Sequence, residues 1–505
     1  MCVCVDVQDG CGAQAVPHQV AQDLQFGVMN RAPSDAASMK HYARSRAWCE
    51  WQEFDTWQPL ALRALADPDV AALSPFQLLS LPGISAAHQR AFAHRWMARR
   101  LHVSAADRSM LAAEFAGAPA RDAAAPSRKI RIGYLSNDFH QHATSLLAVE
   151  MLEAHDCDRF ELYAYSFGAD DGHGMRERLR KAFTCFRDIT ALDDVAAARV
   201  IHADGIDILV DLKGYTAGTR TALLTYRPAP LQVSYLGYPG TLGGAFCDYL
   251  ISDAFITPPG AASDYSEALA RMPHSYQPHG RPAVLAAAPS RASEGLPDDG
   301  VVLCCFNQAY KFTPEVFSVW CTVLDQNPGS VLWLLRSEQA EGNLRREALD
   351  RGIAPHRLVF AADRAQSEHL ARLQLADLVL DTLPFNAHTT ASDALWTGVP
   401  LVTCAGATFA SRVAGSLLHA VGMGELVTYS LRHYRELACA LAGDPTRLRA
   451  LRDRLAAARS SAPLFDVTTY TLDLEHLYGQ MWDRYLSGQP PHALTGVRPP
   501  PACAA

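Results

Sequence analysis

A loop with anion-binding residues stands between an apolar run and a helix-like segment in the last third of the chain. The run 375–380 is typical of a buried strand, and 391–397 is typical of a helix. His388, Thr389 and Thr390 stand where that helix would begin. The first N–H groups of a helix have no internal partner and favour negative charge. With two hydroxyls and an imidazole added, the pattern predicts a site for a nucleotide diphosphate.

The same loop also has a purely structural interpretation. Thr390 and Asp393 have the spacing of a capping box, in which two side chains satisfy each other's backbone donors. Such boxes usually only stabilise the start of a helix. The loop alone therefore leaves both interpretations open.

Polar residues follow other strand-like runs as well. Asp138 and His142 follow the run 130–135, and Lys311 follows the run 301–306. The set suits displacement of a diphosphate leaving group, in which Lys311 would neutralise the developing charge. Asp138 or His142 would manage the proton of the acceptor. Taken singly, the first two could be helix caps or core residues and Lys311 a solvated surface lysine.

Short β-rich runs alternate with helical stretches from residue 129 onward, which is typical of βαβ units and a parallel sheet. A stretch rich in Pro, Ala, Gly and Ser, 277–300, interrupts the pattern before it restarts. We therefore predict an α/β fold with two Rossmann-like halves, 128–280 and 300–465. Strands are expected at 130–135, 160–165, 206–212, 231–236, 249–251, 301–306, 331–335, 358–360, 378–380 and 401–403. Because open parallel sheets bind ligands beyond the carboxyl ends of their strands, the strand-end residues of both halves should face one cleft.

Three further segments flank these halves. Residues 1–125 are expected to form a short helical region, at most a degenerate tetratricopeptide-like (TPR-like) one, because no convincing repeat of about 34 residues is present. Residues 466–487 predict an amphipathic closing helix. The Pro/Ala-rich residues 488–505 predict a disordered tail.

An aromatic stripe marks the helical region. Trp48, Trp51, Phe54 and Trp57 recur at three-residue steps, which predicts one buried helix face. Pro59 should end or kink that helix.

Composition narrows the function classes. The chain has 505 residues, of which 49% are hydrophobic and 19% charged, an ordinary globular balance. The net charge of -8 gives no basic excess that would indicate nucleic acid. The 13 cysteines are scattered, and Cys2 and Cys4 lack the second pair that a zinc site needs. No apolar run is long enough to span a membrane and residues 1–25 lack a signal-peptide core, so we expect no membrane partner and a cytoplasmic protein.

Eight motifs occur in order along residues 129–487. They are Asp138-Phe-His-Gln-His142-Ala-Thr144-Ser, Gly214-Tyr215-Thr216, Arg227-Pro-Ala-Pro, Leu236-Gly-Tyr-Pro-Gly-Thr241, Asp264-Tyr265-Ser-Glu267, Met272-Pro-His274, Phe306-Asn-Gln308-Ala-Tyr-Lys311 and Asn386-Ala-His388-Thr-Thr390. In this combination they resemble the catalytic region of the O-linked N-acetylglucosamine (O-GlcNAc) transferases, a family that also contains the SPINDLY proteins.

The resemblance implies a GT-B glycosyltransferase, in which two Rossmann-like halves hold a nucleotide sugar between them. It implies inverting transfer of N-acetylglucosamine from UDP-GlcNAc to Ser or Thr hydroxyls of proteins, with no metal and no cofactor. The partners would be UDP-GlcNAc or UDP and a protein acceptor.

The resemblance also assigns residues. Those implied for the diphosphate are Gln308, Lys311, His388, Thr389 and Thr390; for the ribose, Asp393; near the nucleotide, His369 and Arg372; on the sugar and acceptor side, Thr144, Tyr215, Leu236 and Gly237. His142 matches a proposed general base and Asp138 a proposed proton relay, and the donor phosphate is a third candidate for taking the proton.

Alternatives remain at this point. SPINDLY-type members use GDP-fucose, but the His388 and Lys311 loops here are closer to those of the N-acetylglucosamine users. Gln366 stands where animal members have a lysine against the uracil, which keeps the donor question open. Because the long repeat array is missing, the protein could also be a non-catalytic or partner-dependent homologue, or act on a small molecule or envelope glycan.

Overall fold

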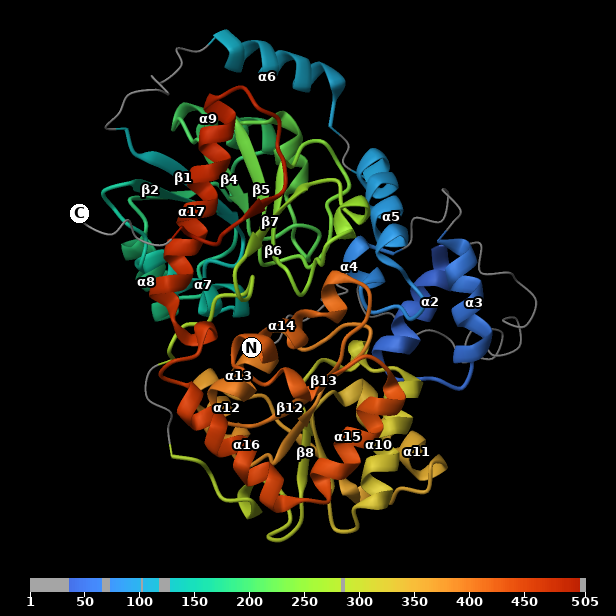
Figure 1. Cartoon of the computed structure of the whole chain (residues 1–505). Helices are drawn as coiled ribbons and strands as arrows, with labels where there is room; N and C mark the ends of the chain where they lie inside the picture. The colour runs from blue at the N-terminus through green and yellow to red at the C-terminus, as the bar shows by residue number, and fades with distance from the viewer. Residues whose placement is uncertain (1–35, 66–72, 101–102, 118–127, 283–286, 500–505) are drawn as a thin grey trace.

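The computed structural model describes residues 36–65, 73–100, 103–117, 128–282 and 287–499. The predictions for Cys2, Cys4 and the rest of residues 1–35 lie outside the described residues. Two α/β halves stack one above the other, with a group of helices beside their boundary (Figure 1). We call them the N-half and the C-half, and the group at residues 36–100 the helical region.

The N-half is built on one parallel sheet of eight strands in the order β14-β7-β6-β5-β4-β1-β2-β3. Its strands are β1 (Ile130–Ser136), β2 (Phe160–Ser166), β3 (Cys185–Asp188), β4 (Ile208–Asp211), β5 (Leu231–Ser234), β6 (Tyr249–Asp253), β7 (Ala268–Met272) and β14 (Leu494–Thr495). Its helices are α6 (Ala105–Gly117), α7 (Ala143–Glu153), α8 (Gly174–Ala182), α9 (Asp194–Ala203) and the short 3-10 turns η2 (Thr221–Tyr226) and η3 (Ala261–Asp264).

The C-half repeats the plan with six parallel strands in the order β10-β9-β8-β11-β12-β13. They are β8 (Val302–Cys305), β9 (Val331–Leu335), β10 (Leu358–Ala361), β11 (Leu378–Leu380), β12 (Leu401–Cys404) and β13 (Val427–Thr428). The helices are α10 (Pro314–Gln326), α11 (Glu338–Asp350), α12 (Gln366–Leu373), α13 (Thr389–Trp396), α14 (Val413–Ala420), α15 (Leu431–Ala442) and α16 (Pro445–Ala458), with 3-10 turns including η5 (Ala309–Lys311).

Both sheets reverse their strand order at one point, which fixes where a ligand fits. In the N-half the reversal lies between β1 and β4, and in the C-half between β8 and β11. Ligands of open α/β sheets bind outside the carboxyl ends of the strands at such a point. All ten predicted strands are present, and the sequence analysis missed β3, β7, β13 and β14, which have only two to five residues.

The helical region differs from its prediction. The aromatic stripe spans two helices, because α2 (Ala36–Ala47) ends before Trp48 and α3 (Phe54–Ala64) begins after Trp51. Cys49 turns the chain between them with a positive φ of 55°. Pro59 lies inside α3 without ending it. Trp51 packs on Phe317 of the C-half at 5.5 Å between ring centroids, so the stripe stabilises a junction between domains.

Two other helices connect this region to the N-half. They are α4 (Pro75–Leu78) and α5 (Ala86–Arg100), and α5 lies against the loop that holds Gly243 and Gly244. The helical region thus contacts both halves, as its position beside their boundary shows (Figure 1).

The C-terminal segment returns to the N-half. Helix α17 (Val467–Leu486) packs against α7, and its Tyr478 and Glu475 reach the N-half core. The prediction of a disordered tail is wrong for Leu494–Thr495, which pair with β7 as strand β14. Backbone hydrogen bonding to a free sheet edge outweighs the Pro/Ala-rich composition there. Residues 500–505 lie outside the described residues.

Buried hydrogen bonds join the two halves. Ser416 Oγ donates to Asp253 Oδ2 at 2.7 Å, and Gln277 Nε2 donates to Ser392 Oγ at 3.0 Å. Residue Gln277 belongs to the stretch predicted as a linker, yet it is only 1% exposed. The segment that connects the two halves is therefore partly packed into the interface between them.

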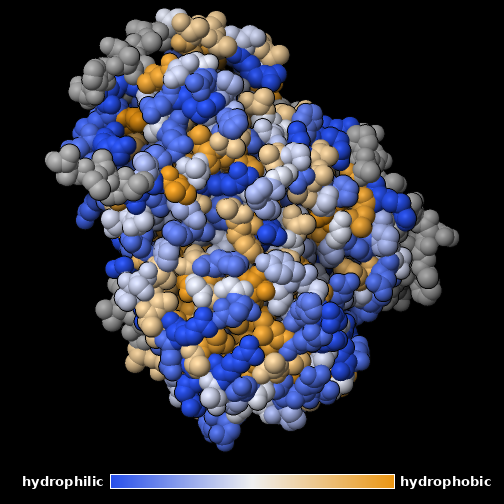
Figure 2. Space-filling view, viewed as in Figure 1, coloured by the Kyte–Doolittle hydropathy of each residue, from blue (hydrophilic) through white to orange (hydrophobic). Residues whose placement is uncertain are grey.

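The surface is that of a polar globular protein on the face seen in Figure 2, with hydrophobic residues interspersed among hydrophilic ones and gathered most clearly over the C-half. Within the described ranges, every helix is too short or too polar to cross a membrane.

Candidate active site

The predicted site residues lie in loops at the two reversal points. Asp138 and His142 follow β1, and Lys311 lies in η5 just after β8. His388 immediately precedes α13, in the loop after β11. The fold therefore brings the predicted residues of each half to the edge where a ligand is expected.

The start of α13 has free donors. Among the described residues, no acceptor bonds to the backbone N–H of Thr389 or Thr390, whereas those of Ala391 and Ser392 bond to the carbonyl of His388. The capping-box interpretation is wrong, because Thr390 lies inside the helix and donates its hydroxyl to Asn307 Oδ1 at 2.7 Å. Two unpartnered N–H groups at a helix N-terminus are a site for an anion.

Lys311 lies beside this helix start. Its ammonium donates to the carbonyl of Asn386 at 2.9 Å and lies 3.9 Å from the centre of the Phe385 ring. The side chain is buried, and burial lowers the pKa of Lys311 to about 8, although the charge of Asp381 opposes the shift. A desolvated cation fixed in place is well suited to a diphosphate, because little reorganisation is needed on binding.

This pKa predicts a pH dependence of nucleotide binding. A bound diphosphate favours the charged ammonium, so the pKa of Lys311 rises in the complex and binding takes up a proton above about pH 8. We expect the affinity for UDP to fall up to about tenfold per pH unit above pH 8. Calorimetric titration with UDP between about pH 7 and pH 9.5 measures this change in affinity. The Lys311→Arg protein, whose charge does not titrate there, should give a flat profile; an equal slope in both proteins contradicts the assignment.

The His388 imidazole bonds to the backbone of the C-half. Its Nε2 is 3.3 Å from the carbonyl of Ala410, an acceptor, so Nε2 carries the proton and donates it to that carbonyl. Burial, and next the charge of Lys311, holds the pKa of His388 well below its usual value, so the ring is neutral. The contact of His388 with the diphosphate stays a prediction.

Asp393 and His369 lie on adjacent helices of the C-half. Residue Asp393 is 8% exposed, and His279 Nε2 lies 3.9 Å from its Oδ1. Burial lowers the pKa of His369 to about 4, while the charge of Asp393 opposes that shift. A neutral ring and a free carboxylate suit a nucleoside.

Arg372 supports this pair from behind. It is fully buried, its Nη1 donates to Ala362 O at 2.5 Å, and its Nη2 lies 3.0 Å from His369 Nδ1. Arg372 therefore orients His369. Gln308 is partly exposed at the N-cap of η5, with no side-chain cap bond, and is free to meet a ligand.

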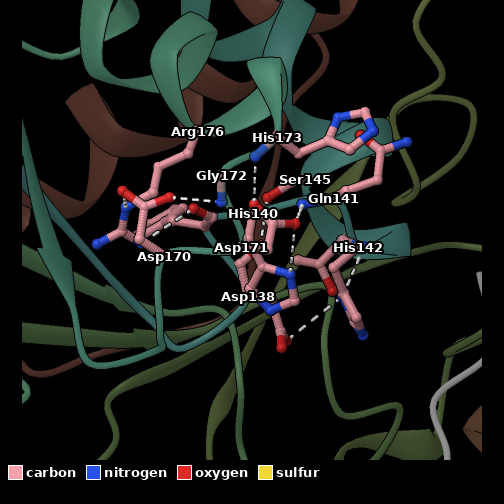
Figure 3. Close-up of polar contacts among 12 residues, drawn as sticks. Asp138, His140, Gln141, His142, Ser145, Asp170, Asp171, Gly172, His173 and Arg176 are labelled. Carbon is pink, nitrogen blue, oxygen red and sulfur yellow. Dashed lines mark hydrogen bonds and ion pairs between the residues drawn. The ribbon is translucent and has the colours of Figure 1, made fainter.

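The N-half contributes His142 and Asp138, which face each other at 3.6 Å between Nδ1 and Oδ2 (Figure 3). Thr144 donates its backbone N–H to His142 Nδ1 at 3.2 Å, so the imidazole caps α7. Burial lowers the pKa of His142 to about 4. The ring is neutral near pH 7, and its accepting Nδ1 places the proton on Nε2.

Lys213 also lies at this site, although the sequence analysis assigned it no role. Its ammonium lies 2.9 Å and 3.0 Å from the two carboxylate oxygens of Asp138. The sequence places Lys213 directly after a strand, which was the available signal. Asp138 is thus an ion-paired carboxylate.

Tyr215, Leu236 and Gly237 lie in the loops that follow β4 and β5. Tyr215 is buried and donates its hydroxyl to Leu242 O at 2.6 Å, and Leu236 adopts a positive φ of 66°. A bulky residue in the left-handed region costs about 1–3 kcal/mol and is typical of functional sites. Both side chains are over nine-tenths buried, so they shape the site more than they present polar groups.

Gly237 gives a testable stability effect. A Cβ there would lie 1.9 Å from the carbonyl oxygen of Leu212, which is backbone and cannot move aside. We expect Gly237→Ala to cost about 3 kcal/mol or more in the free energy of unfolding, measured by denaturant titration. Gly342→Ala in α11 is the control, because nothing lies within 4 Å of its Cβ position. If the two variants have equal stability, the close backbone approach is not real.

Apolar packing connects the two sides of the site. One cluster holds Tyr215 and Tyr238 of the N-half, Phe385 and Ala410 of the C-half and Leu79 of the helical region. The Phe385 ring, which carries Lys311 on its face, also meets Phe76 at 5.8 Å. The helical region therefore supports the lysine through Phe385.

A cavity of about 270 Å³ lies elsewhere, between α2 and α3. Its lining includes Tyr42, Glu53 and Trp57, and none of its lining residues belongs to a strand-end loop. Since the chemistry-bearing residues converge at the strand ends, cavity size does not decide the position of the site.

The site and fold have matches among known proteins. The pattern of glycosyl transferase family 41 covers residues 109–281 and 280–474. The chain belongs to this family. A structure of a lysine-to-methionine mutant of Thermobaculum terrenum O-GlcNAc transferase superposes with a TM-score of 0.76 and 29% identity, over 90% of this chain and 86% of that one. The two facing Rossmann-like halves are thus those of a GT-B glycosyltransferase, as the resemblance predicted.

Curated relatives match as well. The probable UDP-N-acetylglucosamine–peptide N-acetylglucosaminyltransferase SEC of Arabidopsis thaliana is 40% identical over 72% of this chain and 38% of its own length. The Caenorhabditis elegans enzyme of the same activity is 33% identical over 72% and 41%. The tomato (Solanum lycopersicum) SPINDLY relative is 34% identical over 72% and 40%. The match spans about two fifths of each relative's length.

Proposed function

We propose that this family 41 member transfers N-acetylglucosamine from UDP-GlcNAc to Ser or Thr hydroxyls of proteins, with inversion and without a metal. The observation that carries the proposal is the start of α13. Two unpartnered N–H groups lie there, three and four residues beyond Asn386, whose carbonyl accepts a hydrogen bond from Lys311 at 2.9 Å. In this proposal the helix start and Lys311 do for the diphosphate what a metal ion does in metal-dependent transferases. The activities named for the Arabidopsis and nematode relatives support the donor and the acceptor class.

The geometry gives each side of the site a role. The acceptor oxygen bonds to the anomeric carbon as the bond from that carbon to the β-phosphate oxygen breaks, and Lys311 meets the charge that develops on the diphosphate. Asp138 is ion-paired to Lys213, and Nδ1 of His142 accepts from Thr144. Neither group offers a free basic atom, so we assign the hydroxyl proton to a donor phosphate oxygen. His142 Nε2–H acts as a donor toward sugar or acceptor.

The N-acetylglucosamine donor is favoured over GDP-fucose by the relatives. The SEC protein, 40% identical, and the tomato SPINDLY protein, 34% identical, both have names that describe UDP-N-acetylglucosamine–peptide transferases. Gln366 opens α12 and is partly exposed near the proposed nucleotide side, so the base contact differs from the lysine of animal members.

The cysteines support a reducing compartment. The nine cysteines in the described ranges are all unpaired. Free thiols of this number are typical of the cytoplasm, which we propose as the location.

A transfer assay tests the proposal. The full chain is incubated with a proteome-derived peptide library, a metal chelator, and either UDP-GlcNAc or GDP-fucose, and products are read by mass spectrometry with fragmentation. We expect N-acetylhexosamine on Ser or Thr with UDP-GlcNAc only. Deoxyhexose with GDP-fucose supports the fucosyl alternative, and no product with either donor supports the non-catalytic one.

A further inference from the structure

A buried ion pair lies behind His142. Lys213 follows β4 and Asp138 follows β1, so the pair connects the two strands that flank the reversal point of the N-half sheet. The residues are 4% and 5% exposed, and the ammonium contacts both carboxylate oxygens at 2.9 Å and 3.0 Å. Both charges are thus removed from solvent and satisfied by each other.

The backbone of Lys213 is held in place from two directions. Its N–H donates to Asp211 Oδ1 at 2.9 Å, and the next N–H, of Gly214, donates to Asp211 Oδ2 at 3.1 Å. On the other side the Cβ position of Gly237 lies 3.2 Å from Lys213 Cα. The ammonium is therefore placed by three strand ends, as a positioning group requires.

His142 is subject to two opposing influences at the same atom. The Asp138 carboxylate, 3.6 Å from Nδ1, favours a proton there, and the Thr144 N–H, 3.2 Å from Nδ1, requires a lone pair there. A carboxylate already paired with an ammonium attracts a proton less strongly. Burial is the largest influence that keeps the His142 ring neutral, and the ion pair sets how strongly Asp138 opposes it.

We infer that Lys213 is a positioning residue: its ammonium compensates Asp138 and so keeps the His142 imidazole neutral, with the proton on Nε2. His142 can then cap α7 through Nδ1 and present Nε2–H to the substrate at the same time. Without Lys213, the buried carboxylate would be compensated by a proton on Nδ1, and the cap would be lost.

Three other titratable groups lie near the ion pair or His142. The His140 ring is 5.7 Å away between centroids, and Asp171 lies 3.6 Å from His140 Nδ1 (Figure 3). Asp211, behind Lys213, is buried, and burial raises its pKa to about 6. Among these groups Lys213 and His140 lower the pKa of His142 and Asp138 raises it.

The first test needs no enzymatic activity. Protein labelled with 15N-histidine is titrated from about pH 5 to pH 8, and the His142 signals, assigned by their loss in His142→Gln, report protonation and tautomer. In the native protein we expect a neutral ring with Nε2–H throughout. In Lys213→Met the pKa of His142 should rise by roughly one to two units, so that the ring charges within this range.

Two variants keep the test decisive if Lys213→Met folds poorly. Lys213→Arg preserves the charge and should leave His142 neutral. Lys213→Met combined with Asp138→Asn removes both charges and should also leave it neutral. An unchanged His142 tautomer in Lys213→Met, or a charged ring in the double variant, overturns the inference.

The kinetic consequence rests on the proposed function. Lys213→Met should lose up to about fourfold in kcat near pH 5.5 and recover at high pH, while UDP affinity changes by less than about twofold. A pH-independent loss would mark Lys213 as merely structural and contradict the inference. If the native protein neither binds UDP nor transfers sugar, the proposed function fails, yet the histidine titration still tests Lys213.

Discussion

Replacing Lys311 with alanine is expected to slow transfer about 10²–10³-fold, the scale for removing one preorganised group that stabilises developing charge. The ammonium is already fixed at 2.9 Å from Asn386 O and on the face of Phe385, so the native enzyme does not reorganise to meet the diphosphate. Alanine offers no replacement charge. Steady-state kinetics with UDP-GlcNAc and a peptide acceptor measure the loss.

The variant should remain folded. Asp381, the carboxylate that Lys311 faces, accepts hydrogen bonds from Thr403 and from the backbone of Thr382 and Ala387, and burial raises its pKa. It can take up a proton when the lysine is gone. Lys181→Ala on the exposed face of α8 is the control and should keep native rates. Near-native transfer by Lys311→Ala would remove this lysine from the mechanism.

Replacing His142 with alanine should give the second largest loss, about 10²-fold in transfer, because the Nε2–H donor is gone. The imidazole also caps α7, so Ala should cost about 1 kcal/mol in the free energy of unfolding. Kinetics and thermal melting measure the two effects separately.

His142→Asn separates these two roles. Asparagine is a good N-cap, so stability should return toward the native value, while its shorter side chain leaves the donor position empty. We therefore expect transfer as low as in His142→Ala. His433→Ala, on the exposed surface of α15, is the control for a lost histidine. If His142→Asn restores transfer, the histidine acts only as a cap.

The fold could be predicted because its signals are local. The run 301–306 is apolar on both faces, and 130–135 is so apart from Arg131, as expected for strands of a parallel sheet covered by helices. Strand-end polar residues then follow from topology, and Asp138, His142 and Lys311 were predicted that way. Very short strands such as β13 and β14 carry too few residues for any pattern.

The rest depends on contacts between distant segments. Thr390 and Asp393 have the spacing of a cap, but Asn307 takes the Thr390 hydroxyl. The aromatic stripe at 48–57 has helical spacing, but contacts with the C-half break it into two helices. The Lys213–Asp138 pair joins residues 75 positions apart, and no spacing in the sequence predicts it.

Calorimetric titration of the full chain with UDP, UDP-GlcNAc and GDP-fucose, in the presence of a metal chelator, tests the central claim most directly. We predict that UDP and UDP-GlcNAc bind, that GDP-fucose binds at least about tenfold more weakly, and that Lys311→Ala weakens UDP binding by about tenfold or more. Preferential binding of GDP-fucose, or UDP binding that Lys311→Ala leaves intact, would contradict the account.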